Sequence, residues 1–347
     1  MIGTESSAAA SELEFLNKLQ RILNEGLFVA SYKYALILAL AELSVEKKPA
    51  SDGSLTLPLS ELSERFITLY WRQAAPFADG SLLSQNTGRQ ASAITRLAEF
   101  RTGAPTLAAA RRHPQWPSLI RDIGRLLVVM PLWKLQRVGA DRFDFMYEER
   151  LVGRSIVLRP GIATFFQRQF MIVQALVQMA WITFLHKLPP NRALLGSTGD
   201  LAEFLFGAER SGLRAIVEGL SDLQKAQCFY CGETMGDSIA VDHFIPWSRY
   251  PRDLGHNLVL VHTVCNQHKR DMLAAPAHLE RWVNRTINES CALQEIFDAA
   301  RFVSDADASM SVAEWSYENA ERGEAFVWVG RRETCRLSSE WRQCWPR

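Results

Sequence analysis

Apolar residues recur at intervals of three and four positions through much of the first two hundred residues, which is the spacing of an amphipathic helix. This pattern predicts helices at residues 12–25, 32–46, 59–71, 88–101 and 116–136. The second of these segments is apolar nearly all round, so we expect it to be buried in a core. The N-terminal region is therefore predicted to be mainly helical.

The most apolar part of the chain spans residues 165–188 and is long enough to cross a bilayer. Polar side chains interrupt it, and Gln167, Gln174 and Gln178 fall on one helical face. Such side chains are costly in lipid. We therefore predict a long helix over residues 161–188 that is buried in protein, and we expect no membrane partner.

The spacing of apolar residues changes on either side of this helix. Residues 144–147 and 155–158 are short runs that favour strands, either paired as a hairpin or lying apart. Pro189 and Pro190 mark the end of the helix. Helical spacing then returns at residues 200–206, 213–226, 276–288, 292–300 and 311–321. The last three of these segments predict a helical C-terminal tail.

The composition, with 48% hydrophobic and 22% charged residues, is typical of a folded globular protein and excludes wholesale disorder. The 347 residues carry 39 basic and 38 acidic side chains, and the net charge of +1 gives no indication of a nucleic-acid partner. Locally, residues 87–154 hold twelve basic and six acidic side chains, a net charge of +6. This stretch is either a set of solvated helix faces or an arginine-rich surface that contacts phosphates.

The six cysteines all lie at or beyond Cys228, and five of the seven histidines lie in the same part of the chain. This clustering, with an N-terminus that lacks the pattern of a secretory signal, predicts a metal site in a reducing cytoplasm. Cys228 and Cys231 form a pair separated by two residues, and His262 and Cys265 form a second such pair. The four make a Cys3His set for a structural zinc ion, with His268 as the alternative fourth ligand.

Three further elements accompany these pairs. The chain reads Asp242-His243-Phe-Ile-Pro-Trp-Ser, then Asn257-Leu-Val-Leu-Val, then Cys265-Asn266-Gln-His-Lys269. In this order the elements resemble those of the HNH nuclease family, including bacterial restriction and phage-defence members, over residues 228–273. His262 stands where the family often has a cysteine, and Asn266 stands where many members have a histidine.

The resemblance implies a ββα-metal fold, with strands at residues 238–244 and 257–261 and a helix at residues 266–273. Zinc would hold this small module together, because a hairpin and one helix bury too little apolar area alone. We therefore predict an α+β protein in three parts. These are a mainly helical domain at residues 1–220, an HNH nuclease domain at residues 221–275, and a helical C-terminal extension at residues 276–347 that packs on the rest.

Hydrolysis of a phosphodiester needs an activated water, a cation beside the phosphate and stabilisation of the leaving oxygen. Asp242 offers a hard oxygen ligand for Mg²⁺ or Mn²⁺, and Asn266 offers a second. Neutral His243 is then available as the general base on water. The resemblance further implies that Asn257 braces the loop that holds His243.

Basic residues near this centre are candidates for contacts with nucleic acid. Lys269 and Arg270 follow the last motif and would touch a phosphate, and Arg249 lies in the loop between the two strands. That loop is either packed through Trp247 and Tyr250 or lies against a DNA groove.

Together these residues predict a metal-dependent endonuclease that hydrolyses DNA in anti-phage defence or restriction. Its cofactors would be a structural zinc ion and a catalytic Mg²⁺ or Mn²⁺ ion. RNA is an alternative substrate, and a zinc-knuckle nucleic-acid-binding protein without nuclease activity is the alternative function. Because one such centre cuts one strand at a time, a double-strand break implies two protomers. Expected protein partners are therefore a second copy of the chain or other defence proteins.

Overall fold

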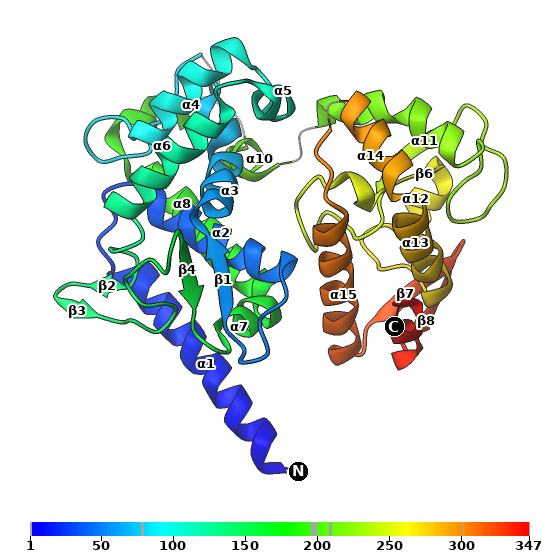
Figure 1. Cartoon of the computed structure of the whole chain (residues 1–347), viewed down its shortest axis with the longest axis horizontal. Coiled ribbons are helices and arrows are strands. Elements are labelled where there is room, and N and C mark those ends of the chain that lie inside the picture. Colours follow the sequence, from blue (N-terminus) through cyan, green and yellow to red (C-terminus); the bar gives the residue numbers. More distant parts are fainter. Residues whose placement is uncertain (1, 78–79, 196–199, 208–209, 301, 347) are drawn as a thin grey trace. The chain divides into compact units, whose positions relative to one another are not determined.

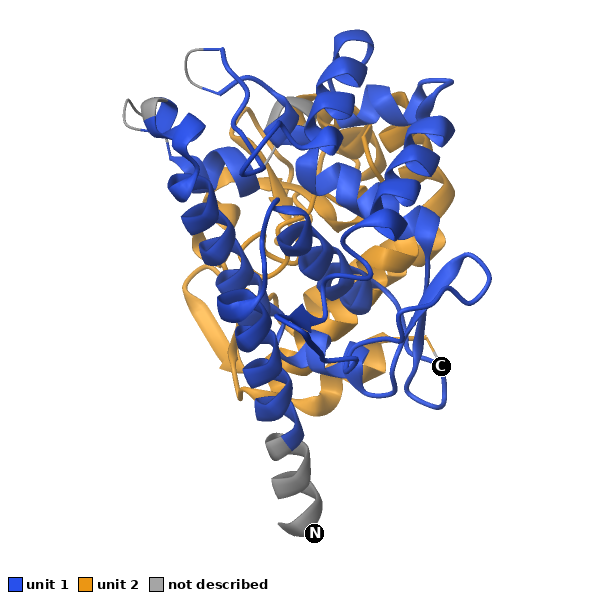
Figure 2. Ribbon diagram, turned by 90° about the vertical axis from the view of Figure 1, so that its left-hand side faces the viewer, with its two compact units in different colours: residues 1–207 blue, residues 208–347 orange. Residues whose placement is uncertain are grey.

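The computed structural model describes residues 2–77, 80–195, 200–207, 210–300 and 302–346. Most of its helices and strands are labelled in Figure 1. The chain forms two compact units, Met1–Gly207 and Ala208–Arg347, which Figure 2 draws in different colours. The second unit thus begins before residue 220, the expected end of the helical domain. It includes both the nuclease segment and the C-terminal extension.

Unit 1 consists mainly of helices, as the sequence predicts. They are α1 (Ile2–Glu25), α2 (Tyr32–Glu46), α3 (Leu59–Trp71), α4 (Ser92–Gly103), α5 (Leu107–Arg112), α6 (Trp116–Val129), α7 (Ile162–Arg168), α8 (Phe170–Lys187), α9 (Arg192–Leu195) and α10 (Leu201–Phe206), with 3-10 turns η1 (Arg72–Ala74) and η2 (Pro189–Asn191). All residues of α2 except Glu42 are buried, and α2 packs against α3, α7 and α8. The buried helix predicted at residues 32–46 is confirmed.

Helix α3 lies between α2 and α6. Arg65 of α3 pairs with Glu42 and Glu46 of α2, at N–O distances of 2.7 and 2.5 Å. On the other side, Gly124 of α6 permits a close approach, because a Cβ there would lie 3.1 Å from Oγ of Ser63. Helix α6 ends at Val129 rather than continuing to residue 136. Met130 precedes a proline, which disfavours the helical conformation at that residue.

The helix predicted over residues 161–188 is in fact two helices, α7 and α8, which meet at Gln169. Gln169 has a ψ of 16°, and its side-chain amide donates to Glu12 of α1 at 2.7 Å. One stripe of α8 is buried: Phe170, Val173, Val177, Trp181 and Leu185. By length and composition alone, α8 would also suffice to cross a membrane, a criterion that core helices of globular proteins meet as well.

Two short sheets complete unit 1. Strand β1 (Leu55–Pro58) pairs antiparallel with β4 (Ser155–Leu158), and β2 (Arg137–Val138) pairs with β3 (Asp141–Arg142). The strand predicted at residues 155–158 is confirmed. Its predicted neighbour at residues 144–147 is wrong as a strand, since only Tyr147 forms a bridge, to Leu158.

Unit 2 contains the expected hairpin and helix. Its elements are η3 (Arg210–Ile216), α11 (Val217–Leu223), β5 (Ile239–His243), η4 (Gly255–Asn257), β6 (Leu258–His262), α12 (Thr263–Lys269), α13 (Pro276–Asn288), α14 (Ser290–Ala299), α15 (Ala306–Arg322), β7 (Phe326–Gly330), β8 (Glu333–Arg336) and η5 (Ser339–Cys344). Strands β5 and β6 pair antiparallel, and α12 packs against both of them. This is the predicted ββα arrangement.

The C-terminal part of unit 2 supports the ββα core. Trp282 of α13 stacks on Phe244, the residue after β5, with ring centroids 5.1 Å apart. The hydroxyl of Tyr317 donates to the carbonyl of Ala274 at 2.6 Å. The predicted helices are present in this tail, but it also contains the β7–β8 hairpin, which the helical pattern did not predict. Trp328 of β7 is buried and forms a bridge to Ala274.

Candidate active site and zinc cluster

Four metal-ligating side chains meet at one end of the β5–β6 hairpin. The ligand atoms of Cys228, Cys231, His262 and Cys265 all lie within 4.8 Å of one another. Nδ1 of His262 is 3.3 Å from Sγ of Cys231, and its Nε2 is 3.3 Å from the carbonyl oxygen of Thr234. With Nε2 protonated and donating to that carbonyl, Nδ1 faces the thiols as a ligating histidine requires.

The segment from Cys228 to Gly232 forms the tight turn of a zinc knuckle. Gly232, directly after Cys231, has a φ of +74°, a conformation that residues with side chains rarely adopt. Its N–H donates to the carbonyl of Cys228 at 2.9 Å. The backbone N–H of His262 also points at Sγ of Cys228, at 3.3 Å. The sulfur is thereby fixed toward the centre of the cluster.

The chemistry of this donor set fits zinc. Burial, followed by the neighbouring thiols of Cys228 and Cys231, raises the pKa of Cys265 to about 12. Thiols this close oppose ionisation of one another unless a cation is shared between them, and thiolates are the form that binds zinc. The group includes His262 and not His268, so His262 is the fourth member of the set.

Asp242 lies near the other end of the hairpin, buried in β5. Its Oδ2 accepts hydrogen bonds from the hydroxyl of Tyr230 at 2.6 Å and from Nζ of Lys269 at 2.9 Å. Burial, and then the charge of Asp242, raise the pKa of Tyr230 well above its usual value, so the hydroxyl stays a donor. Both contacts involve one oxygen and fix the orientation of the carboxylate.

His243 is held by a partner that sequence reasoning missed. Its Nε2 lies 2.8 Å from Oδ1 of Asp253, and its ring forms a T-shaped contact with the ring of Trp247, with centroids 5.3 Å apart. A carboxylate at Nε2 favours the tautomer in which Nε2 carries the proton and Nδ1 is free to accept one. Asp253 lies in the loop between β5 and η4, where no motif identifies it.

Asn257 clamps the backbone that follows His243. Its Oδ1 accepts from the N–H of Ile245 at 2.7 Å, and its Nδ2 donates to the carbonyl of the same residue at 2.9 Å. The asparagine is buried, so these two hydrogen bonds satisfy groups that water does not reach.

The remaining predicted residues lie on or near α12 and differ in exposure. Asn266 is half-buried in α12, which packs against β5, and Arg270 is exposed just after the helix. Lys269 is fully buried, and besides Asp242 it contacts the carbonyl of His243 at 3.0 Å. Arg249 is half-buried, and burial lowers its pKa. Of the three basic residues predicted to contact nucleic acid, Arg270 is thus the exposed one.

The comparisons with known proteins agree with this arrangement. Residues 228–275 match the family model described as HNH endonuclease, so the second unit contains an HNH endonuclease domain, a domain that acts on nucleic acid. Residues 12–205, more than half of the chain, match the family described as Domain of unknown function (DUF8808), and the chain belongs to that family. No curated protein and no solved structure matches the chain.

Proposed function

We propose that this protein is a metal-dependent endonuclease that hydrolyses phosphodiester bonds in DNA. The observation that carries the proposal is the pairing of His243 with Asp253 at 2.8 Å, in the residue that directly follows the buried Asp242 in the chain. A protein that only bound nucleic acid would need neither an oriented histidine nor a carboxylate fixed by two donors. The match to an HNH endonuclease over residues 228–275 supports the same reaction.

In this proposal the residues in and around the hairpin have separate roles in the reaction. His243 accepts the proton of the attacking water at Nδ1, while Asp253 holds the proton on Nε2.

Tyr230 and Lys269 occupy Oδ2 of Asp242, which leaves Oδ1 to face a hard cation. The amide oxygen of Asn266 is the second donor, and such oxygen ligands suit Mg²⁺ or Mn²⁺. When bound, this cation would neutralise charge on the phosphate and on the leaving 3′ oxygen.

The zinc cluster has a structural role in the proposal. Its Cys3His set supplies all four ligands of a tetrahedral zinc ion, so no open position remains for water or phosphate. The cluster joins the knuckle to the β6–α12 junction and so holds the ββα core in shape. The biological setting in the proposal is anti-phage defence or restriction in the cytoplasm; the resemblance of the motifs supports the first part, and the clustering of the cysteines supports the second.

A plasmid-nicking assay tests this function. The purified full chain should convert supercoiled plasmid to nicked or linear DNA in Mg²⁺ and leave it intact in excess EDTA. His243→Ala should reduce the rate by roughly 10²–10⁴-fold, as is typical for loss of a general base. Its melting temperature should be unchanged, because the histidine is partly exposed.

The alternative function gives a different result in the same experiment. A zinc-knuckle binding protein would retard the plasmid in a gel without nicking it, and His243→Ala would behave as the parent chain. Cleavage of an RNA of matched length, with the plasmid left intact, would instead transfer the activity to RNA.

A further inference from the structure

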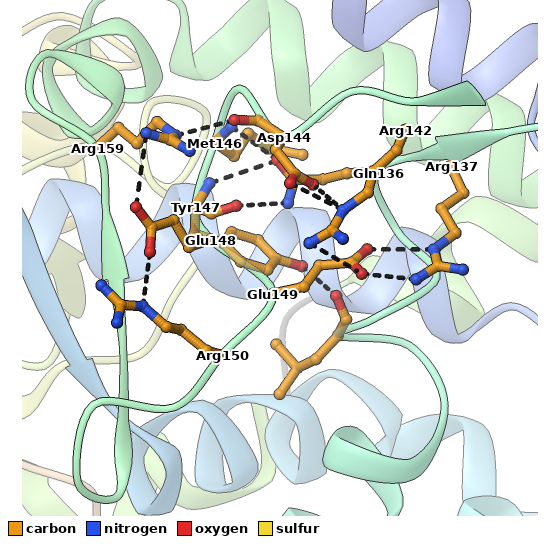
Figure 3. Close-up of polar contacts among 11 residues, drawn as sticks. Gln136, Arg137, Arg142, Asp144, Met146, Tyr147, Glu148, Glu149, Arg150 and Arg159 are labelled. Atoms are coloured by element: carbon orange, nitrogen blue, oxygen red, sulfur yellow. Dashed lines mark hydrogen bonds and ion pairs between the residues drawn. The ribbon is translucent and has the colours of Figure 1, made fainter.

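The arginine-rich stretch at residues 87–154 separates into two groups in unit 1. In the first, arginines and acids alternate around the β2–β3 hairpin (Figure 3). The ion pairs are Arg137–Glu149, Arg142–Asp144, Arg142–Glu149, Arg150–Glu148 and Arg159–Glu148, with N–O distances between 2.6 and 3.9 Å. Because neighbouring carboxylates neutralise these guanidinium groups, this part of the stretch fits the solvated-face interpretation.

The second group has fewer carboxylate partners. Arg121 and Arg125 lie on α6, Arg154 lies just before β4, and all three are exposed. Arg125 pairs with Asp122 at 3.1 Å, but the same carboxylate also pairs with Arg96. Within the part of the chain that the structure describes, Arg121 and Arg154 have no ion pair. A positive surface therefore remains here.

These three arginines contribute to a pocket of about 370 Å³ between α3 and α6. Its apolar lining comes from Leu59, Ile120, Val128 and Val129, and hydroxyl groups come from Ser60 and Ser63. None of the described residues that line it is acidic. The pocket thus offers aliphatic surface and three guanidinium groups to a single ligand.

We propose that this pocket binds the sugar-phosphate backbone of a DNA strand. Guanidinium groups match the geometry of phosphate oxygens and donate paired hydrogen bonds to them. The aliphatic lining would pack against the C–H face of a deoxyribose. The volume lies at the low end of ligand sites, about 300–1,000 Å³, and accommodates a nucleotide unit rather than a folded partner. Contacts of this kind position a strand without reading its sequence.

The proposal rests on the nuclease function proposed above, since it states that unit 1 binds the DNA that unit 2 cleaves. It is tested with full-length His243→Ala protein, which should bind DNA without cutting it. Affinity for a fluorescein-labelled DNA oligonucleotide is measured by anisotropy over a range of salt concentrations. The test variant adds Arg121→Ala and Arg154→Ala. The matched control adds Arg142→Ala and Arg150→Ala, which remove the same charge from the paired group.

The test variant should bind roughly ten- to a hundredfold more weakly at moderate salt, and the slope of log affinity against log salt should fall by about two. The control should change affinity and slope far less, because its arginines already have carboxylate partners. Equal losses in the two variants would overturn the proposal. So would displacement of the oligonucleotide by low concentrations of free dAMP, which would identify a mononucleotide site instead.

A separate plasmid assay distinguishes this proposal from the nuclease function. Cleavage by the parent chain together with unchanged DNA binding by the test variant would refute only the pocket. Loss of binding in the test variant, with no cleavage by the parent chain under any metal, would refute only the nuclease function. If the test variant melts at the same temperature as the parent chain, its loss of affinity reflects lost DNA contacts and not a loss of folded protein.

Discussion

The two ends of the β5–β6 hairpin carry clusters of opposite character. At one end Ile239 pairs with His262, beside the three cysteines, and at the other end His243 pairs with Leu258. At about 3.3 Å per residue, these ends are roughly 13 Å apart. The first cluster consists of four ligands that face one another. The second consists of groups that each contact a different polar partner.

This difference indicates how one small fold separates structure from chemistry. Four ligands around one point fill all coordination positions of a tetrahedral zinc ion, so no position remains for a substrate. In the second cluster, Asp253 and Lys269 fix the orientation of His243 and Asp242. Among the residues that the structure describes, Nδ1 of the histidine and Oδ1 of the carboxylate have no hydrogen-bond partner. The first end should therefore control folding, and the second end should control the reaction.

The largest effect should follow disruption of the zinc end. Cys231→Ser should remove the zinc, abolish cleavage and lower Tm by roughly 10 °C or more, since about 1 kcal/mol shifts Tm by ~2–8 °C in domains of this size range. Metal analysis and thermal melting measure both changes. Cys291→Ser is the matched control, because Cys291 is exposed and lies outside the cluster. A Cys231→Ser protein with one zinc per chain would contradict the assignment of the cluster.

An intermediate effect is expected at the partner of the histidine. Asp253→Asn should lower kcat by about 10–100-fold, as loss of an orienting partner does, with little change in KM or Tm. Asp253→Glu should recover part of the loss, because it restores a carboxylate. Asp237→Asn, at an exposed carboxylate before β5, serves as the control and should cleave normally. If Asp253→Asn and the control have the same kcat, Asp253 does not position His243.

The smallest effect should come from the clamp behind the active site. Asn257→Ala leaves the buried N–H and carbonyl of Ile245 without their partners, which should lower the free energy of unfolding by roughly 1–3 kcal/mol. Denaturant unfolding measures this loss. Asn288→Ala changes the same residue type at an exposed position and should be neutral within error. Identical unfolding midpoints would show that the clamp adds nothing to stability.

Much of unit 2 could be predicted because its function depends on residue order. The zinc ligands follow from spacing, and the resemblance to the HNH family implies the two strands and the helix. The strand ends agree with the prediction within one residue, whereas α12 begins three residues before, and ends four residues before, the predicted helix at residues 266–273. Asp253 could not be predicted, since a loop acid reaches a histidine only through a backbone path that spacing does not define. The buried Lys269 was likewise expected at a phosphate, and only the packing of α12 reveals its contact with Asp242.

In unit 1 the local pattern predicted helices well and long-range pairing poorly. Helices α2 and α3 have the predicted bounds. Strand β1 contains Pro58 and pairs with β4 across about a hundred residues, a partner that no local signal specifies. The break at Gln169 is similarly missed, because its side chain bonds to Glu12 on a distant helix. The β7–β8 hairpin could not be predicted, because β8 is fully exposed and its sequence does not alternate between apolar and polar residues.

The most direct test of the division between the two ends is the metal requirement of the zinc-loaded protein. Chain purified with one zinc and freed of exchangeable metal should be folded but inactive. It should cleave plasmid DNA when Mg²⁺ or Mn²⁺ is added. Asp242→Ala should stay inactive at every Mg²⁺ concentration, since alanine provides no ligand to saturate. Full cleavage by the zinc-only protein would contradict the account and would make zinc the catalytic ion.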